Sequence, residues 1–259
     1  MKKILFLGYN KNKTSLIEKI NTNSKKWSIK QTNKKINLQT AKKFDSIVCF
    51  GYRHIIDKKI IHNLKKPIIN LHIGYLPYNR GNHPNFWSFV ENTPSGITIS
   101  EVDNGIDTGN IIYQKIIDFK LLENKNSLTF FKTYKTLVSE IERLFLINME
   151  NIINHNFNSS RQIGKGTFHN KKDLPVLLKS WKQNIHKTVI KYDKIKRLEL
   201  KKRLLILDKI ENTRKNNNIN WMNIVRTSLK NSSQSTLNIL EKINTDDNSI
   251  TKLFKDLIK

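Results

Sequence analysis

The chain has 259 residues, which is enough for one large domain or two smaller ones with a substantial core. Its 47 Lys and Arg residues against 21 Asp and Glu residues give a formal net charge of +26, which invites a nucleic-acid or membrane-surface partner. The excess is spread along the chain, with +14 in the first 170 residues and +12 in the remainder, and it accompanies an abundance of Asn and Ile. We therefore interpret it as compositional drift, such as an A+T-rich genome causes, and expect no stable nucleic-acid complex. The alternative is an electrostatic role in attracting an anionic substrate.

Cysteine usage and hydropathy predict a cytoplasmic protein. The single cysteine, Cys49, excludes an internal disulfide and a Cys-rich zinc site, and its apolar surroundings favour a small buried hydrophobe. The apolar run near the N-terminus ends at Gly8, which is too short for the core of a signal peptide. No window approaches the ~18 apolar residues typical of a membrane-spanning helix, so we expect no membrane insertion.

Short apolar strands alternate with helical stretches in the first third of the chain. Strands are expected at 3–8, 27–31, 43–52 and 65–73, and helices at 14–20, capped by Thr14, and at 58–64. This alternation predicts a parallel, doubly wound α/β sheet, in which ligands bind beyond the carboxyl ends of the strands. Gly8, Gly51 and the segment with Asn70 and His72 lie at such ends, so we expect them to share one crevice.

Asn70 and His72 have the same parity on the strand at 65–73, so both side chains leave one face. A polar pair on one face of an apolar strand needs hydrogen-bond partners or a functional role. Two further strands, 98–102 and 110–117, flank the turn DNGIDTG. This turn is similar to the start of a calcium loop but lacks the Gly and Glu that such a loop needs, and the histidines show no metal-ligand spacing, so we expect no metal.

The remainder of the chain is predicted to be helical around one surface loop. A long helix is expected at 127–149, with an apolar stripe of Leu128, Phe131, Tyr134, Val138, Ile141 and Phe145. The turn-rich stretch 156–175 predicts a surface loop. Polar, basic helices are then expected at 176–212, 220–230, 235–243 and 249–258. A cluster of Leu204, Leu207, Ile210, Trp221, Ile224 and Val225 on these helices would serve docking or self-association, as in a homodimer.

An ordered series of residues runs through forty positions of the chain: Asn70, Leu71, His72, Leu76, Pro77, Arg80, Gly81, Pro84, Trp87, Gly96, Thr98, Asp107, Thr108 and Gly109. This series resembles the 10-formyltetrahydrofolate-dependent formyltransferase family, which includes methionyl-tRNA formyltransferase, glycinamide ribonucleotide transformylase and the sugar-nucleotide N-formyltransferases. The continuous LPYNRGNHPNFWSF, FGYRHI at 50–55 and GKGTFH at 164–169 look closer to the sugar branch. The resemblance covers roughly residues 1 to 175.

The resemblance implies an α/β fold: a Rossmann-like formyltransferase domain with a mainly parallel sheet at 1–175, followed by a helical, basic C-terminal extension at 176–259. It implies a catalytic triad of Asn70, His72 and Asp107, with 10-formyltetrahydrofolate as the co-substrate. Candidate folate contacts are Tyr52, Arg53, His54, Asp103, Gly105 and Ile106. Candidate substrate contacts are Arg80, Gly81, Lys165, Thr167 and His169. The sugar branch formylates a dideoxy-aminohexose linked to a nucleotide, usually dTDP, for surface polysaccharide such as lipopolysaccharide.

The chemistry of the three side chains suits acyl transfer to an amine. An amide N–H of Asn70 can donate to the tetrahedral oxyanion, His72 is a suitable general base, and Asp107 can orient the imidazole and stabilise its charged form. No metal is needed for this chemistry.

Two other readings remain open. Methionyl-tRNA formyltransferase would suit the basic charge, although its OB-like second domain needs short strands that are not predicted after Pro175. The other is a non-catalytic basic binding protein on the same fold.

Overall fold

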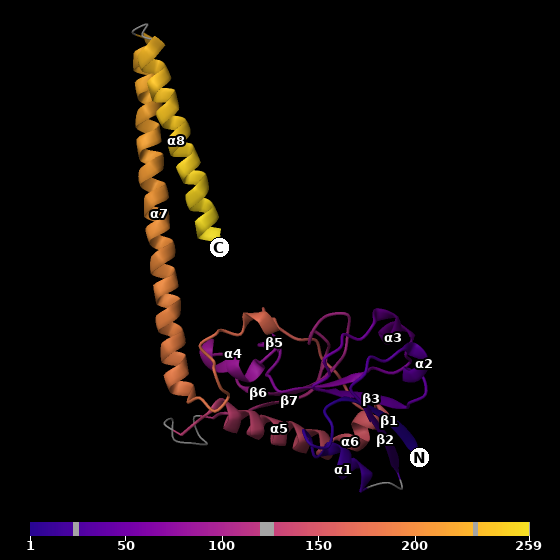
Figure 1. The fold of residues 1–259 in the computed structure, drawn as a ribbon. Helices are drawn as coiled ribbons and strands as arrows, with labels where there is room; N and C mark the ends of the chain where they lie inside the picture. The colour runs from indigo at the N-terminus through magenta and orange to yellow at the C-terminus, as the bar shows by residue number, and fades with distance from the viewer. Residues whose placement is uncertain (23–25, 120–126, 230–232, 259) are drawn as a thin grey trace. The chain divides into compact units, whose positions relative to one another are not determined.

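The computed structural model describes residues 1–22, 26–119, 127–229 and 233–258 (Figure 1). The chain divides into two compact units, unit 1 (Met1–Ile190) and unit 2 (Lys191–Lys259). Unit 1 carries the α/β sheet, and unit 2 is helical throughout its described residues.

Unit 1 is built on a six-stranded sheet with the order β2-β1-β3-β4-β6-β7. Its strands are β1 (Lys2–Gly8), β2 (Trp27–Thr32), β3 (Ser46–Phe50), β4 (Ile69–His72), β6 (Gly96–Glu101) and β7 (Ile111–Ile116). The first four strands in chain order are parallel, whereas β6 pairs antiparallel with both β4 and β7. The prediction of a mainly parallel sheet is confirmed.

Helices cover both faces of this sheet. They are α1 (Leu16–Asn21), α2 (Leu38–Ala41), α3 (Lys58–Asn63), α4 (Pro84–Val90), α5 (Phe130–Ile147) and α6 (Met149–Asn154). Figure 1 shows α2 and α3 on one face and α1, α5 and α6 on the other. Leu5 and Leu7 of β1 pack with Ile60 of α3 in one buried cluster, because alternate strand residues point to one face. The four-residue α2 was not predicted, and the side chain of Asn37 caps it by accepting from Thr40 N.

The N-cap position of α1 is Ser15, one residue after the predicted Thr14, because the helix begins at Leu16; Thr14 Oγ1 still accepts from Leu16 N at 3.2 Å. Thr14 and Ser15 also bond a buried carboxylate on α5. Glu142, which is 6% exposed, accepts from Thr14 Oγ1 at 2.7 Å and from Ser15 N at 3.0 Å, and its second oxygen accepts from Ser15 Oγ. These bonds tie the loop after β1 to α5.

We expect Glu142→Gln to lower the free energy of unfolding by about 1–3 kcal/mol, because a neutral amide loses the charge-assisted hydrogen bonds that the carboxylate accepts from Thr14 and Ser15 in a buried site. Urea denaturation followed by circular dichroism measures this change. The matched control is Glu150→Gln. The wild-type Glu150 carboxylate pairs with Lys26 at an exposed position, so this substitution should lower the free energy of unfolding by less than about 1 kcal/mol. Equal losses in the two variants would contradict the assigned role of the Glu142 network.

The apolar stripe of α5 is as predicted at Ile141 and Phe145, which are buried, but lies one position from the predicted one in the first half of the helix. The helix begins at Phe130, and the side chain of Thr129 caps it by accepting from Lys132 N. Phe130 is fully buried, whereas the predicted Phe131 is 38% exposed. Because Leu128 lies before the helix, it does not extend the helical spacing backwards, and the prediction for Phe131 is wrong.

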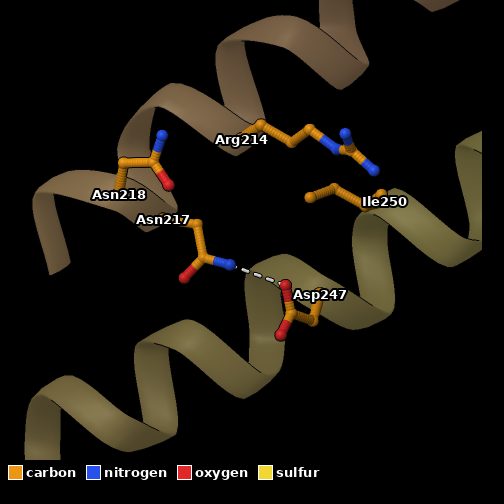
Figure 2. A pocket seen from close by; sticks show the side chains of 5 residues that line it. All are labelled: Arg214, Asn217, Asn218, Asp247 and Ile250. Atoms are coloured by element: carbon orange, nitrogen blue, oxygen red, sulfur yellow. Dashed lines mark hydrogen bonds between the residues drawn. The ribbon is translucent and has the colours of Figure 1, made fainter. Parts of the chain in front are cut away.

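Two predicted breaks in the C-terminal helices are also wrong, and the third, at 231–235, falls partly on residues outside the described part of the chain. Helix α7 (Ile185–Leu229) continues through 216–220, α8 (Ser233–Ile258) continues through 244–248, and residues 176–184 are not helical. Asn217 Nδ2 donates to Asp247 Oδ1 at 2.6 Å, beside a pocket of about 360 Å³ within unit 2 (Figure 2). Asn side chains break helices when they bond their own backbone, and here a partner on the facing helix removes that competition.

The proposed cluster in unit 2 is only partly present. Ile210 is 3% exposed, but Leu204 and Leu207 are 49% and 48% exposed, so these two do not join a buried cluster. The side chains of Trp221, Ile224 and Val225 lie outside the described part of the chain. None of the described helices is both long and apolar enough to cross a membrane.

Candidate active site

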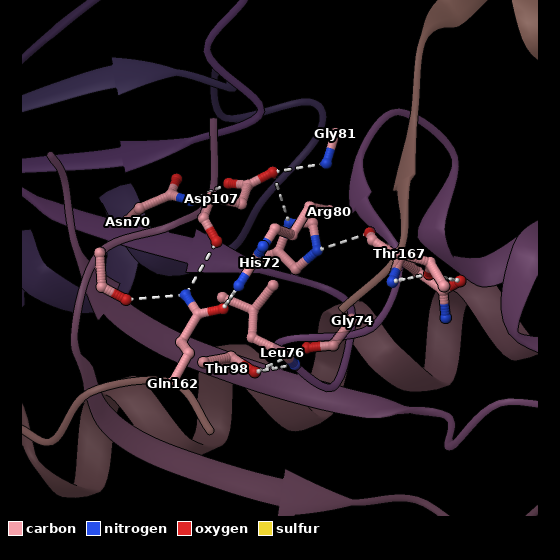
Figure 3. A network of polar contacts seen from close by, with 12 residues as sticks. Asn70, His72, Gly74, Leu76, Arg80, Gly81, Thr98, Asp107, Gln162 and Thr167 are labelled. Atoms are coloured by element: carbon pink, nitrogen blue, oxygen red, sulfur yellow. Dashed lines mark hydrogen bonds and ion pairs between the residues drawn. The ribbon is translucent and has the colours of Figure 1, made fainter. Parts of the chain in front are cut away.

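Strand β4 places Asn70 and His72 at the centre of the sheet. Asn70 lies between Cys49 of β3 and Ser100 of β6, and His72 lies opposite Thr98. His72 is 7% exposed and Asn70 is partly buried. The shared parity of the two residues brings both side chains toward the turn that follows β6 (Figure 3).

Asp107 joins the two side chains. Its Oδ1 accepts from Asn70 Nδ2 at 2.9 Å, and its Oδ2 accepts from Gly81 N at 2.8 Å and lies 3.6 Å from His72 Nδ1. The Asp107 side chain is only 13% exposed, so solvent screens these contacts weakly. The structure therefore brings the three predicted catalytic side chains together around one carboxylate.

The hydrogen bonding of His72 defines which ring nitrogen is basic. Its Nε2 lies 3.2 Å from the backbone oxygen of Asn79. Because a carbonyl oxygen only accepts, Nε2 must carry the hydrogen in this contact, and Nδ1 is then unprotonated in the neutral ring. The basic nitrogen thus faces Asp107.

Cys49, which pairs in register with Asn70, is not a nucleophile near neutral pH. Burial, and secondarily the Asp107 carboxylate, raise the pKa of its thiol to about 12. Because the thiolate is the reactive form, the buried thiol is inert.

The DNGIDTG turn is held in place by its own side chains. Asp103 Oδ1 accepts from Gly105 N at 3.0 Å and from Thr108 Oγ1 at 2.6 Å. Gly109 lies so close to the backbone oxygen of Glu101 that any side chain would overlap it. Asp107 itself has a φ of 55°, in the left-handed region that non-glycine residues rarely adopt. The turn therefore aims the Asp107 carboxylate back toward β4.

Thr98, which is fully buried, anchors the loop that follows β4. Its Oγ1 donates to Gly74 O at 2.7 Å and accepts from Leu76 N at 3.1 Å and from Gln114 Nε2 at 2.9 Å. Gln114 Nε2 also donates to Leu76 O at 2.7 Å. Thr98 thus acts through the loop backbone and not through the triad side chains.

The loop with Arg80 and Gly81 pairs with the loop from the GKGTFH segment. Strand β5 (Arg80–Gly81) runs parallel to β8 (Phe168–His169). Thr167 Oγ1 accepts from Asn79 N at 2.8 Å, and Thr167 O accepts from Arg80 N at 3.0 Å. Of the five predicted substrate contacts, four lie on these paired strands or next to them, and Lys165 is exposed nearby in sequence.

His169 is held inside the protein. It is 8% exposed, its ring stacks on Trp87 at 3.9 Å between centroids, and its Nε2 lies 3.1 Å from Glu91 Oε2. These contacts link β8 to α4. They show that His169 packs the loop, whereas Lys165 presents its ammonium group to solvent.

The FGYRHI segment follows β3 and contacts the loop after β2. Tyr52 OH donates to Lys34 O at 3.0 Å, and His54 Nε2 lies 3.0 Å from Asn33 O. Burial raises the pKa of the Tyr52 hydroxyl. Tyr52 packs on the same apolar cluster as Val102, which precedes the DNGIDTG turn. The two groups of predicted folate contacts therefore flank one cluster, with Arg53 and Ile106 exposed.

Gln162 was missed by the sequence analysis. Its Nε2 donates to Asp107 O and to Gly109 O, both at 2.8 Å. Its Oε1 accepts from Arg80 Nε at 3.0 Å and Nη2 at 2.7 Å. It lies 55 residues after Asp107 in a loop without a regular pattern, so only the fold brings the two together.

The fold and the site define a doubly wound α/β protein with an amide, an imidazole and a carboxylate at the centre of its sheet. The sequence profile of the Formyl transferase family matches residues 3–131. Among solved structures, the chain is similar to the formyltransferase PseJ from Anoxybacillus kamchatkensis, with 34% sequence identity. That structure is a complex with UDP-4,6-dideoxy-4-formamido-L-AltNAc and tetrahydrofolate. The match has a TM-score of 0.64 and covers 72% of this chain and 97% of that one. The chain belongs to the formyl transferase family.

Two groups of curated relatives match a smaller part of the chain. The methionyl-tRNA formyltransferase of Nitratiruptor sp. is 34% identical over 109 residues, which are 42% of this chain and 35% of that protein. The dTDP-4-amino-4,6-dideoxyglucose formyltransferase of Mycobacterium tuberculosis is 24% identical over 139 residues, 54% of this chain and 56% of that protein. The chain thus spans about a third to just over half of the curated relatives it matches.

Proposed function

We propose that this protein transfers a formyl group from 10-formyltetrahydrofolate to the amino group of a nucleotide-linked amino sugar, in the synthesis of a surface polysaccharide. The observation that carries the proposal is the convergence of Asn70 and His72 on Asp107, in a chain that matches nearly the whole of a sugar formyltransferase at 34% identity.

The reaction begins when the neutral amine attacks the formyl carbon, so that a carbon–nitrogen bond forms and the carbonyl oxygen becomes an oxyanion. Asn70 Nδ2 uses one N–H for Asp107, and its second N–H makes no hydrogen bond to the residues that the structure describes. That N–H donates to the oxyanion. One such donor is typically worth about 10²- to 10³-fold in rate.

The amine nitrogen must then lose a proton. His72 Nδ1 accepts it, and the adjacent Asp107 Oδ2, at 3.6 Å, stabilises the imidazolium that forms. The tetrahedral intermediate collapses by breaking the bond to the folate nitrogen, which takes up the proton that His72 holds, so that the imidazole is neutral again. The products are the formamido sugar and tetrahydrofolate.

The loops around the triad divide between the two substrates. We assign the folate to the side of Tyr52, Arg53, His54 and the DNGIDTG turn, which flank one apolar cluster. We assign the nucleotide to the side of Arg80 and Lys165, whose positive charges suit a diphosphate. The PseJ complex holds a UDP sugar, so UDP-linked amino sugars stand beside the dTDP-linked ones as candidate substrates.

Methionyl-tRNA is the second candidate acceptor, favoured by the net charge of +26 and by the match to the Nitratiruptor enzyme. The described residues after His169 contain no strand, and the long helices α7 and α8 occupy this part of the chain. An OB-like second domain would need several strands there. We therefore rank this candidate below the amino sugar.

The test is to incubate the protein with 10-formyltetrahydrofolate and a panel of dTDP- and UDP-linked amino sugars, and to look by mass spectrometry for the gain of one formyl group. We expect at least one amino sugar to react. Formylation of methionyl-tRNA alone would make the tRNA reading correct. Absence of turnover with every amine would favour a non-catalytic binding protein.

A further inference from the structure

Gln162 connects the turn that carries Asp107 to the loop that carries Arg80. A glutamine amide has two N–H donors and one oxygen with two acceptor positions. All four are used here: the donors reach Asp107 O and Gly109 O, and the oxygen accepts from Arg80 Nε and Nη2 (Figure 3). A flipped amide would set its N–H₂ against the guanidinium and its oxygen against two carbonyls, so the observed orientation is the one the site accepts.

Asp107 needs this kind of support. Its φ of 55° costs on the order of 1–3 kcal/mol for a non-glycine residue, and such a conformation persists only when the surroundings over-determine it. Asn70 and Gly81 hold its side chain, but they bond only the carboxylate oxygens. Gln162 bonds its main-chain oxygen and that of Gly109 two residues on, and so holds the backbone from which the carboxylate projects.

Arg80 closes a ring of contacts around the carboxylate. Its guanidinium bonds Gln162, while the next residue, Gly81, donates its backbone N–H to Asp107 Oδ2 at 2.8 Å. The main chain and the side chain of Asp107 are thus fixed by two neighbouring residues of one loop, one of them acting through Gln162. Because the ring is closed, a shift of the Asp107 backbone also strains the contact with Gly81.

We propose that Gln162 is a positioning residue for formyl transfer: it holds the Asp107 backbone so that the carboxylate stays directed at His72 and Asn70. This inference rests on the proposed function. A displacement of about 1 Å in a catalytic group can cost on the order of 10²-fold in rate.

Two substitutions separate the contacts of Gln162. Gln162→Met keeps the length of the side chain and removes every hydrogen bond, whereas Gln162→Glu keeps the acceptor for Arg80 and loses both donors to the Asp107 turn. We expect each variant to lower kcat about 10- to 100-fold, with KM for 10-formyltetrahydrofolate within about 3-fold of the wild type. The control is Gln183→Met, which should leave kcat unchanged. In the wild type, Gln183 Oε1 accepts from the backbone N–H groups of Lys179 and Ser180.

A double-mutant cycle distinguishes positioning from a general loss of structure. If Gln162 acts through Asp107, Gln162→Met in an Asp107→Asn background should lower the residual single-turnover rate by less than about 3-fold. A full, additive loss in that background would overturn the proposal. So would normal kcat in Gln162→Met.

A readout that does not depend on turnover separates this inference from the proposed function. The Gly81 amide proton donates to a carboxylate, so its NMR resonance should lie downfield and move upfield in Gln162→Met, but not in Gln183→Met. An unmoved Gly81 resonance would overturn the positioning role. If the wild type formylates no amine at all, the proposed function fails, and the Gly81 resonance still decides what Gln162 does.

Discussion

His72→Gln should lower kcat for formyl transfer by about 10²- to 10⁴-fold, the range typical of a lost general base. Glutamine can still donate from its amide to Asn79 O, the contact that His72 Nε2 makes at 3.2 Å, so the loop keeps its anchor. What disappears is the basic Nδ1 beside Asp107. The measurement is steady-state formylation of the amino sugar that the substrate panel identifies, with melting temperature as a check on folding.

The matched control for this variant is His186→Gln, at an exposed position in the first turn of α7. It changes the same residue type and should leave both kcat and the melting temperature unchanged. If His72→Gln retained more than about a tenth of wild-type kcat while remaining folded, His72 could not be the base, and proton removal would have to be assigned to another group.

The grouping of Asn70, His72 and Asp107 could be predicted, because two of the residues are close in sequence and a family resemblance supplied the third. Asn70 and His72 share a strand face through simple alternation, and the DNGIDTG turn contains the residues that bend a chain back on itself. The resemblance of the ordered series then placed Asp107 beside them, and the structure brings all three together. The mainly parallel sheet followed from the alternation of strands and helices.

What could not be predicted depends on contacts between distant segments. Gln162 lies in a turn-rich loop, and nothing in its neighbourhood indicates that its amide reaches Asp107. Glu142 of α5 accepts from the Ser15 hydroxyl, and Ser15, at the N-cap position of α1, makes no side-chain cap bond. The Asn-rich stretch at 216–220 stays helical because Asn217 bonds Asp247 on α8. In the Asn-rich stretch a tertiary hydrogen bond outweighed a local preference of well under about 1 kcal/mol per residue.

Asp107→Asn should be nearly as damaging as the loss of the base. Two unit charges 3.6 Å apart, as Asp107 Oδ2 and a protonated His72 would be, attract each other by on the order of 4 kcal/mol at an effective dielectric constant of ~20. That attraction exists only once the imidazole has taken the proton. It therefore stabilises the transition state and not the ground state, and so lowers the barrier. Partial screening by solvent reduces the figure, and we expect kcat to fall by about 10³-fold.

The same substitution retains the shape of the side chain, so folding should survive it. An asparagine oxygen can still accept from Gly81 N, but its amide N–H₂ would then face Asn70 Nδ2, and one of the two amides must turn away. KM for the folate should therefore change little, while kcat carries the loss. The comparison variant is Asp208→Asn, at an exposed position on α7, which should behave as the wild type. A rise in KM with kcat unchanged would show that Asp107 holds a substrate and does not stabilise the charged imidazole.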